Sequence, residues 1–354
     1  MLIDTAVSFR LNNDSEIYEA NNNQIKKINK NITCEKMKTV SNETETIVTN
    51  DISTWSYFLK NDIKWKNAVI LVVLHIIAIY GFITFPYIER YKTVLYMQFM
   101  IIFSGFGVTC GAHRFWSHRS FSAKLPLRIL LATCFISASQ VPVSAWVREH
   151  RVHHKFSETN ADPHDSRRGF FFSHCGWLML DKHPAVLQKS KTINMSDIEA
   201  DPVVTFTDRY FKFLKLIVMF TTVAIPVYCW NESWYYAVMS QFLKFIYNSH
   251  STWCLNSVAH MWGYKPYNRS IASADNSFVH LVTYGEGCHN YHHTFPSDYS
   301  TPEIGIGGFD VTTKLIHFFA KIGWAYNLKK SSTSLVERTI RSRGDANILS
   351  SALI

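Results

Sequence analysis

Nine of the sixteen histidines in this chain of 354 residues fall into four short clusters. Imidazole is the commonest metal ligand in proteins, and two clusters have the spacing i, i+3, i+4, which places three rings on one face of a helix. Packing alone gives no reason for this arrangement, because neighbouring rings repel each other when protonated. The clusters are His113-Arg-Phe-Trp-Ser-His118, His150-Arg-Val-His153-His154, Asn256-Ser-Val-Ala-His260 and His289-Asn-Tyr-His292-His293.

The number of clustered imidazoles indicates how many metal ions they bind. One structural zinc ion uses four ligands, usually including cysteine, so nine histidines favour a centre with two metal ions. His113 and His118 diverge by about 140° on an ideal α-helix, and we expect the helix to end or bend between them. Asn256 and His260 are expected to share one helical face. The histidines outside the clusters are interpreted as packed or surface side chains, with His164 as the strongest candidate for a place beside the ligands.

The elements that carry these clusters are predicted to lie in and beside a membrane. Apolar residues make up 47% of the chain and are concentrated in blocks. Crossing a bilayer core of about 30 Å takes roughly 20 apolar residues, and four stretches come close to this length. Two short loops join them in pairs, so the predicted fold class is an all-α integral membrane protein with two helical hairpins. The four predicted transmembrane helices cover about residues 68–86, 94–112, 214–231 and 234–258.

A fifth apolar stretch, Leu125 to Trp146, is predicted to stay on one side of the membrane. It contains Arg128, and a charged group at mid-bilayer costs about 2.5 to 3.5 kcal/mol on the insertion scale. If this stretch crossed, the first two histidine clusters would lie on opposite faces and could not share metal ions. With four crossings, all four clusters lie on one face, in a helical cap formed by residues 113–210 and 259–328.

Basic residues predict that this face is cytosolic. Lys60, Lys64 and Lys66 precede the first span and further basic residues accompany the histidines, so the positive-inside rule places both termini and the metal centre in the cytosol. The seven cysteines show no CxxC spacing, which suits a reducing compartment. The net charge of +9 is assigned to contacts with lipid headgroups, an anionic substrate or an acidic protein rather than with nucleic acid.

The two ends of the chain are predicted to lack a packed structure. Residues 1–60 are rich in Asn, Thr, Lys and Glu, without a sustained apolar period, and are interpreted as a disordered polar cytosolic arm. The apolar run from Met1 to Phe9 is too short for a secretory signal and contains Asp4. Residues 61–328 are assigned to a membrane domain, and residues 329–354 to a flexible cytosolic tail.

The clusters resemble the three histidine boxes of the membrane acyl-CoA desaturases. The resemblance covers roughly residues 55 to 328 and is closest in style to the insect branch of the stearoyl-CoA desaturase group. It extends through His150-Arg-Val-His-His-Lys-Phe-Ser-Glu-Thr, Ala161-Asp-Pro-His164, Gly285-Glu-Gly-Cys-His-Asn-Tyr-His-His-Thr-Phe-Pro296 and Phe319-Ala-Lys-Ile-Gly-Trp-Ala-Tyr326.

The resemblance implies an enzyme of the endoplasmic reticulum membrane with a di-iron site in its cytosolic cap. Such an enzyme uses O2 to place a cis double bond in a fatty acyl-CoA with release of water, and its electrons come from cytochrome b5 and an NADH-dependent reductase. This chain has no glycine-rich nucleotide fingerprint, so NADH is expected to bind the reductase. Carried over position by position, two Fe²⁺ (iron) ions would be held by His113, His118, His150, His153, His154, His260, His289, His292 and His293, with Asn256 acting through water.

The resemblance also implies a narrow tunnel that selects acyl chains by length and shape. The tunnel would bend beside Gln140, Trp146 and Thr252. Its closed end would lie between the first two helices, where Ile101 and Gly105 would set its depth, and the small Gly105 is expected to admit a longer acyl tail. The headgroup would be bound by Arg148, Lys182 and Trp253.

The chain departs from the family pattern at several positions near the expected headgroup site. Asp181 precedes Lys182 where relatives carry arginine, and Val141-Pro142 replaces a polar stretch after Gln140. Asn160 and Ser297 are also unusual. None of these is a proposed ligand, so we interpret the changes as a diverged substrate preference.

Three functions are compatible with the sequence. The first is desaturation of a long-chain acyl-CoA, near carbon nine or at another position used in making insect hydrocarbons or pheromones. The second is fatty acyl hydroxylation at a similar di-iron centre, and the third is lipid binding without catalysis. The spacing of the two HxxHH clusters favours desaturation over hydroxylation. The presence of all nine ligands argues against a non-catalytic relative.

Overall fold

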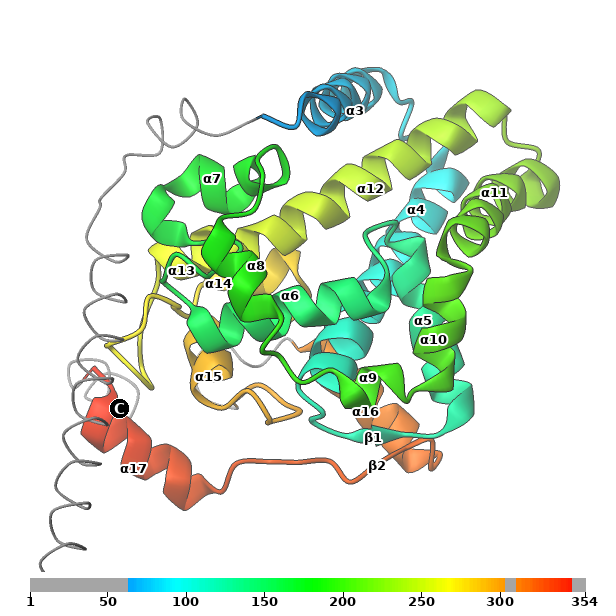
Figure 1. Ribbon diagram of the computed structural model, residues 1–354. Coiled ribbons are helices and arrows are strands. Elements are labelled where there is room, and N and C mark those ends of the chain that lie inside the picture. The colour runs from blue at the N-terminus through cyan, green and yellow to red at the C-terminus, as the bar shows by residue number, and fades with distance from the viewer. Residues whose placement is uncertain (1–62, 303–309, 346–354) are drawn as a thin grey trace, which may run out of the picture. The chain divides into compact units, whose positions relative to one another are not determined.

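The computed structural model describes residues 63–302 and 310–345 (Figure 1). The predicted arm at residues 1–60 lies outside this range. The helices are α3 (Trp65–Thr84), α4 (Tyr91–Phe106), η1 (Gly107–Ser117), α5 (Leu125–Ser137), α6 (Val143–Phe156), η2 (Ser166–Arg168), α7 (Phe170–His174), η3 (Gly176–Leu178), α8 (Pro184–Ser190), α9 (Ser196–Glu199), α10 (Pro202–Arg209), α11 (Phe211–Trp230), α12 (Trp234–Asn256), α13 (Val258–Met261), α14 (Ser277–Val282), α15 (His289–Thr294), α16 (Val311–Lys321) and α17 (Thr333–Arg343).

Two short strands complete the regular structure in the part of the chain that is described. β1 (Ser122–Ala123) pairs antiparallel with β2 (Ala325–Tyr326), with Ser122 opposite Tyr326. This pairing ties the segment after the first histidine cluster to the end of α16. The described part of the chain is therefore helical apart from one two-stranded sheet.

Three described helices are long and apolar enough to cross a membrane: α3, α11, and α4 together with η1, which form one helix of 27 residues. The fourth predicted span is a helix of 23 residues, α12, but it is not among the three because it carries many polar residues. α12 packs against α3, α4 and α11 (Figure 1). Its buried Ser240, Lys244 and Asn248 therefore face neighbouring helices, as polar groups in membrane helices usually do.

Two lysines of the long helices, Lys244 of α12 and Lys215 of α11, form hydrogen bonds at the carboxyl end of α5. Lys244 Nζ donates to the carbonyl of Ser137 at 2.9 Å, and Lys215 Nζ donates to the carbonyl of Ser139 at 2.7 Å. The last carbonyls of a helix lack partners and carry partial negative charge, so Lys244 stabilises the carboxyl end of α5, and Lys215 bonds to the turn that follows it. With 13 residues, α5 is about 20 Å long and too short to cross a bilayer core.

The two hairpin loops meet in a buried polar cluster at the end of the helices away from the histidines. Glu232, between α11 and α12, accepts a hydrogen bond of 2.5 Å from Thr93 Oγ1 and forms an ion pair of 3.2 Å with Arg90. Trp230 Nε1 donates to the same threonine at 3.0 Å. Because Arg90 and Thr93 belong to the other hairpin, this cluster joins the two hairpins.

The largest core cluster lies where η1, α5, α6, α10 and α16 meet. Phe135 and Leu131 of α5 and Val147 of α6 are fully buried in it. A Cβ atom at Gly107 would overlap the backbone of Phe135, so glycine is required for η1 to approach α5 this closely. This core fixes the two helices that carry the first two histidine clusters.

Residues 329–354 were predicted to form a flexible tail, but residues 333–343 are helical. These residues form α17, and Val336 and Ile340 pack against a small core that includes Tyr291 and Phe295. The physical reason is the apolar pair Val336 and Ile340, spaced i, i+4 on a helix that is otherwise mostly polar and charged. Residues 346–354 lie outside the described part.

We predict that Glu232→Gln destabilises the fold by about 1 to 2 kcal/mol, because Arg90 and Thr93 lose a buried charged acceptor. Thermal unfolding of the purified protein in detergent measures this loss. Glu89→Gln is the matched control, since it removes an exposed carboxylate from the loop between α3 and α4, next to Arg90. Equal unfolding temperatures for the two variants would contradict a stabilising role for the cluster.

Candidate metal centre and adjoining cavity

The first histidine cluster lies at the end of a π-helix. In η1 the backbone bonds run from residue i to i+5, and the bond from the amide of His118 to the carbonyl of His113 continues this pattern at 3.1 Å. The helix ends at Ser117, in agreement with the expected end between the two histidines. The widened turn was not predicted, and it brings the two rings to a centroid separation of 4.9 Å. Short π-helical segments occur frequently at functional sites.

The second cluster lies on α6, whose carboxyl half presents His150, His153 and His154. Trp146, one turn earlier, stacks on the His150 ring with centroids 4.9 Å apart. The fourth cluster forms the short helix α15, whose first residue is His289. Asp275 accepts hydrogen bonds from the amides of Asn290 and Tyr291 at 2.8 and 3.2 Å, which fixes the first turn of α15.

The third cluster does not lie on one continuous helix. α12 ends at Asn256, Ser257 forms a turn with φ −110° and ψ −74°, and His260 belongs to the separate helix α13. Asn256 and His260 therefore lie on two successive helices rather than on the single continuous helix that their spacing predicted. The hydroxyl of Ser257 donates to the carbonyl of Trp253, four residues earlier, at 2.8 Å. It also contacts His174 Nδ1 at 2.9 Å, and spacing in the sequence contains no sign of this tertiary contact.

The nine histidines converge from these four segments into two groups. Within each group, one ring nitrogen of every histidine lies within 4.8 Å of those of the others. One group contains His113, His118, His150, His154 and His292, and the other contains His153, His260, His289 and His293. Each cluster on α6 and α15 contributes to both groups, so the two groups are adjacent.

The distances between ring nitrogens fit metal coordination. His113 Nε2 lies 2.8 Å from His292 Nε2, and His118 Nε2 lies 2.8 Å from His150 Nε2. In the second group, His289 Nε2 lies 3.0 Å from His260 Nε2. Two nitrogens that bind one ion at right angles, each at about 2.1 Å, are about 3 Å apart. The donor set of five and four imidazoles therefore suits two transition-metal ions.

Burial favours the neutral form of seven of these rings. It lowers the pKa of His118, His150 and His154 well below the usual range, and neighbouring histidines lower it further. The same causes lower the pKa of His289 to about 3. A metal ligand must offer an unprotonated nitrogen, so this environment favours the binding form of the ring.

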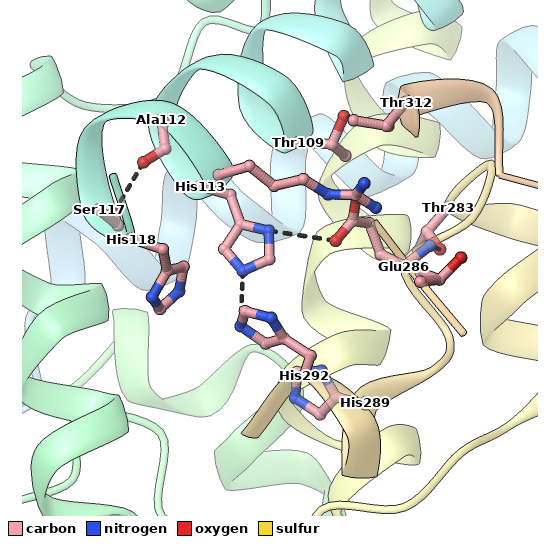
Figure 2. A network of polar contacts seen from close by, with 12 residues as sticks. Thr109, Ala112, His113, Ser117, His118, Thr283, Glu286, His289, His292 and Thr312 are labelled. Atoms are coloured by element: carbon pink, nitrogen blue, oxygen red, sulfur yellow. Dashed lines mark hydrogen bonds and ion pairs between the residues drawn. The ribbon is translucent and has the colours of Figure 1, made fainter. Parts of the chain in front are cut away.

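Carboxylates orient two of the rings from behind. His113 Nδ1 lies 3.1 Å from Glu286, while its Nε2 points at His292 (Figure 2). His153 Nδ1 lies 2.9 Å from Asp162. A carboxylate on the far nitrogen fixes the tautomer and the orientation of a ligand ring. Glu286 and Asp162 were not among the residues predicted from the sequence, although both lie in segments that carry the family resemblance.

Glu286 belongs to a buried charge network. Arg114 lies 2.7 Å from Glu286 and 3.1 Å from Asp310, and all three side chains are almost fully buried. Burial alone would raise the pKa of Glu286, but the charge of Arg114 and the hydrogen bond of His113 outweigh it and lower the pKa to about 2. The carboxylate therefore stays ionised beside the ligand ring.

A cavity of about 390 Å³ adjoins the histidines. His150 and Asn256 line it, together with five of the residues predicted to contact substrate: Gln140, Trp146, Lys182, Thr252 and Trp253. Gln140 Nε2 donates to Thr252 Oγ1 at 3.4 Å, so one wall is closed by a contact between the segment after α5 and α12. The cavity thus connects a polar rim with the metal-binding face of α6.

Three of the predicted substrate residues lie outside the lining of this cavity. Arg148 contacts Glu199 at 3.9 Å on the cap. Ile101 is buried in α4, and a Cβ atom built at Gly105 has no neighbour within 4 Å. The cavity lining also includes Lys64, Asn67 and Glu149, which sequence analysis did not assign because their neighbours come from distant segments.

Comparison with known proteins shows which proteins this chain resembles over most of its length. Residues 92–302 match the family model described as fatty acid desaturase. That range includes all nine clustered histidines and most of the cavity lining. The chain is similar to "Acyl-CoA Delta-9 desaturase" of Acheta domesticus, with 45% identity over 81% of each chain.

Two further relatives show similar agreement. "Stearoyl-CoA desaturase 4" of Mus musculus is 44% identical over 82% of this chain and 83% of its own length. "Acyl-CoA Delta(11) desaturase" of Trichoplusia ni is 43% identical over 80% of this chain and 81% of its own length. The relatives named for two double-bond positions are thus almost equally similar to this chain.

We predict that Glu286→Gln lowers the affinity for metal about 10- to 100-fold, because His113 loses its charged partner. Iron content after dialysis against increasing concentrations of a chelator measures the change. Glu232→Gln is the control, since it also removes a buried paired carboxylate but lies at the other end of the helices. Equal metal retention in both variants would contradict the orienting role of Glu286.

Proposed function

Because the chain belongs to the fatty acid desaturase family, we propose that it is a membrane acyl-CoA desaturase that uses O2 to introduce a double bond into a long-chain fatty acyl-CoA. The observation that carries the proposal is the convergence of nine histidines into two adjacent groups at one side of a cavity. The names of the similar proteins support the acyl-CoA substrate. The length of the substrate tunnel would set the position of the double bond, at carbon nine or elsewhere. That position would in turn decide whether the product serves insect hydrocarbons or pheromones.

The metal of the proposed centre is iron. One Fe²⁺ would be held by His113, His118, His150, His154 and His292, and the other by His153, His260, His289, His293 and, through water, Asn256. When bound, the pair of ions supplies the oxidising power from O2 that removal of hydrogen from an unactivated methylene requires. Its electrons would come from cytochrome b5 and its NADH-dependent reductase, and reconstitution with and without cytochrome b5 tests this partner.

The side chains of this protein would position the acyl chain and exclude water from the metal centre. An acyl chain offers no polar group near the reacting carbons, so its path past the metal centre must be set by shape. Trp146 lies flat against His150 and would form the wall of that path at the metal centre. The contact of Gln140 with Thr252 would keep the path bent, and Lys182, Arg148 and Trp253 would hold the headgroup.

The proposed enzyme lies in the endoplasmic reticulum membrane with four spans, and α12 is the fourth. This is supported by the packing of α12 among the three apolar helices and by the burial of its polar residues. Both termini and the metal centre would then be cytosolic. Protease access to α17 in sealed microsomes tests this orientation, and protection of α17 would contradict it.

We predict that replacing His150, His154, His289 or His293 by alanine abolishes double-bond formation, because each removes one ligand of a group of four or five. The test is expression in a yeast lacking its own desaturase, with mass spectrometry of derivatised fatty acids. His317→Ala is the matched control, because His317 is exposed and lies outside both groups. Hydroxylated products in the parent strain would show a hydroxylase, and full activity of two ligand variants would refute the proposal.

We also predict that Gly105→Tyr shortens the preferred acyl chain. A side chain at this position enters open space, so a tyrosine can fill the volume without displacing α4. The chain-length profile of the unsaturated products in the same yeast measures the effect, and Gly105→Ala should change it little. An unchanged profile in the tyrosine variant would remove Gly105 from the tunnel.

A further inference from the structure

The rim of the cavity carries two ion pairs. Lys182 contacts Glu149, and both line the cavity. Lys64, which also lines the cavity, lies 3.0 Å from Asp181. The side chains of Lys64 and Asp181 are 38% and 62% exposed, whereas those of Lys182 and Glu149 are 33% and 26% exposed. These four residues form the polar rim, and their formal charges cancel.

The position of Lys64 does not depend on its ion pair. The amide of Lys64 donates to the carbonyl of Met179 at 2.8 Å, and Asn67 Nδ2 donates to the carbonyl of Leu178 at 3.0 Å. Ile63 forms a bridge with Leu180. The start of α3 is thus fastened to residues 178–180 by backbone contacts, and the carboxylate of Asp181 only restrains the end of the lysine side chain.

A third basic residue near the proposed headgroup site is paired as well. Arg148 Nη2 lies 3.9 Å from Glu199, and its Nη1 lies 3.5 Å from the carbonyl of Ser190. Each of Lys64, Arg148 and Lys182 therefore has an acidic partner. A polyanionic headgroup that reaches this surface must compete with carboxylates for the cations and is repelled by the carboxylates themselves.

We infer that Asp181 is a specificity-determining residue that restrains Lys64 and so weakens binding of the phosphate-bearing headgroup of acyl-CoA. The inference rests on the proposed function and adds a residue that sets the affinity for its substrate. Asp181 acts through Lys64 at the rim, and neither residue is close to a proposed metal ligand along the chain. It therefore affects how strongly substrate binds and leaves the rate of the chemical step unchanged.

The size of the effect follows from the exposure of the pair. Exposed ion pairs contribute little to stability, so phosphate groups can displace Asp181 from Lys64 at a modest cost. Removing the carboxylate charge should therefore increase the affinity for acyl-CoA by about two- to fivefold. Because the interaction is screened by salt, the gain should shrink as ionic strength rises.

The experiment compares Asp181→Asn with the parent protein, both loaded with iron and reconstituted in lipid nanodiscs. Equilibrium binding is measured for stearoyl-CoA and for the stearoyl thioester of N-acetylcysteamine, which lacks phosphates. We expect tighter binding of stearoyl-CoA, unchanged binding of the neutral thioester, a lower KM and an unchanged kcat. Asp181→Ser is a second variant that also removes the charge. Glu337→Gln, on α17, is the control for a general change of protein charge.

A double-mutant cycle with Lys64→Gln tests the route of the effect. If Asp181 acts by restraining Lys64, its substitution gains little affinity when Lys64 is already absent. An equal gain in the Lys64→Gln background would overturn this route. Weaker or unchanged binding of stearoyl-CoA by both Asp181 variants would overturn the inference as a whole. Absence of stearoyl-CoA binding and of desaturation by the parent would instead refute the proposed function.

Discussion

The candidate metal centre depends on holding nine imidazoles close together, although charged imidazoles repel one another. Burial and mutual repulsion of the charged forms both favour the unprotonated ring. Neutral rings pack at 4 to 5 Å like other aromatic groups, as His154 and His293 do with stacked centroids 4.1 Å apart. The helices that present them must therefore be held from outside the centre, by the apolar core below α5 and by buried charges behind the rings.

Arg114 is the main link among these buried charges. It follows His113 directly in η1 and contacts Glu286, Asp310 and the carbonyl of Tyr299. One helical segment thus supplies a candidate ligand and the cation that holds the carboxylate behind that ligand. A buried cation is costly unless several acceptors surround it, and removing one acceptor leaves an uncompensated charge. The segments that carry the first and fourth histidine clusters are therefore held together by charge as well as by packing.

Local patterns in the sequence predicted much of this arrangement, and tertiary contacts account for what they missed. The spacing in His150-Arg-Val-His153-His154 is a property of one helix, so it predicted a shared face. Ser257, at the break between α12 and α13, contacts His174, 83 residues away, and no local pattern contains this contact. A lysine such as Lys244 is usually exposed, and its burial inside the helix bundle is explained by its hydrogen bond to the carbonyl of Ser137. The rim pairs of Lys64 and Lys182 were missed for the same reason.

The π-helical form of η1 limits how this segment can change in evolution. Its wide turns hold residues 107–117 between the membrane helix α4 and the cap, with His113 and His118 joined by a backbone bond. Loss of one residue between His113 and His118 would let this turn wind as an ordinary α-helix, with the two histidines at i, i+4. Their rings would then lie one above the other along one helical face, unlike the contact that the widened turn gives them. The length of this segment is therefore constrained as well as its residue types.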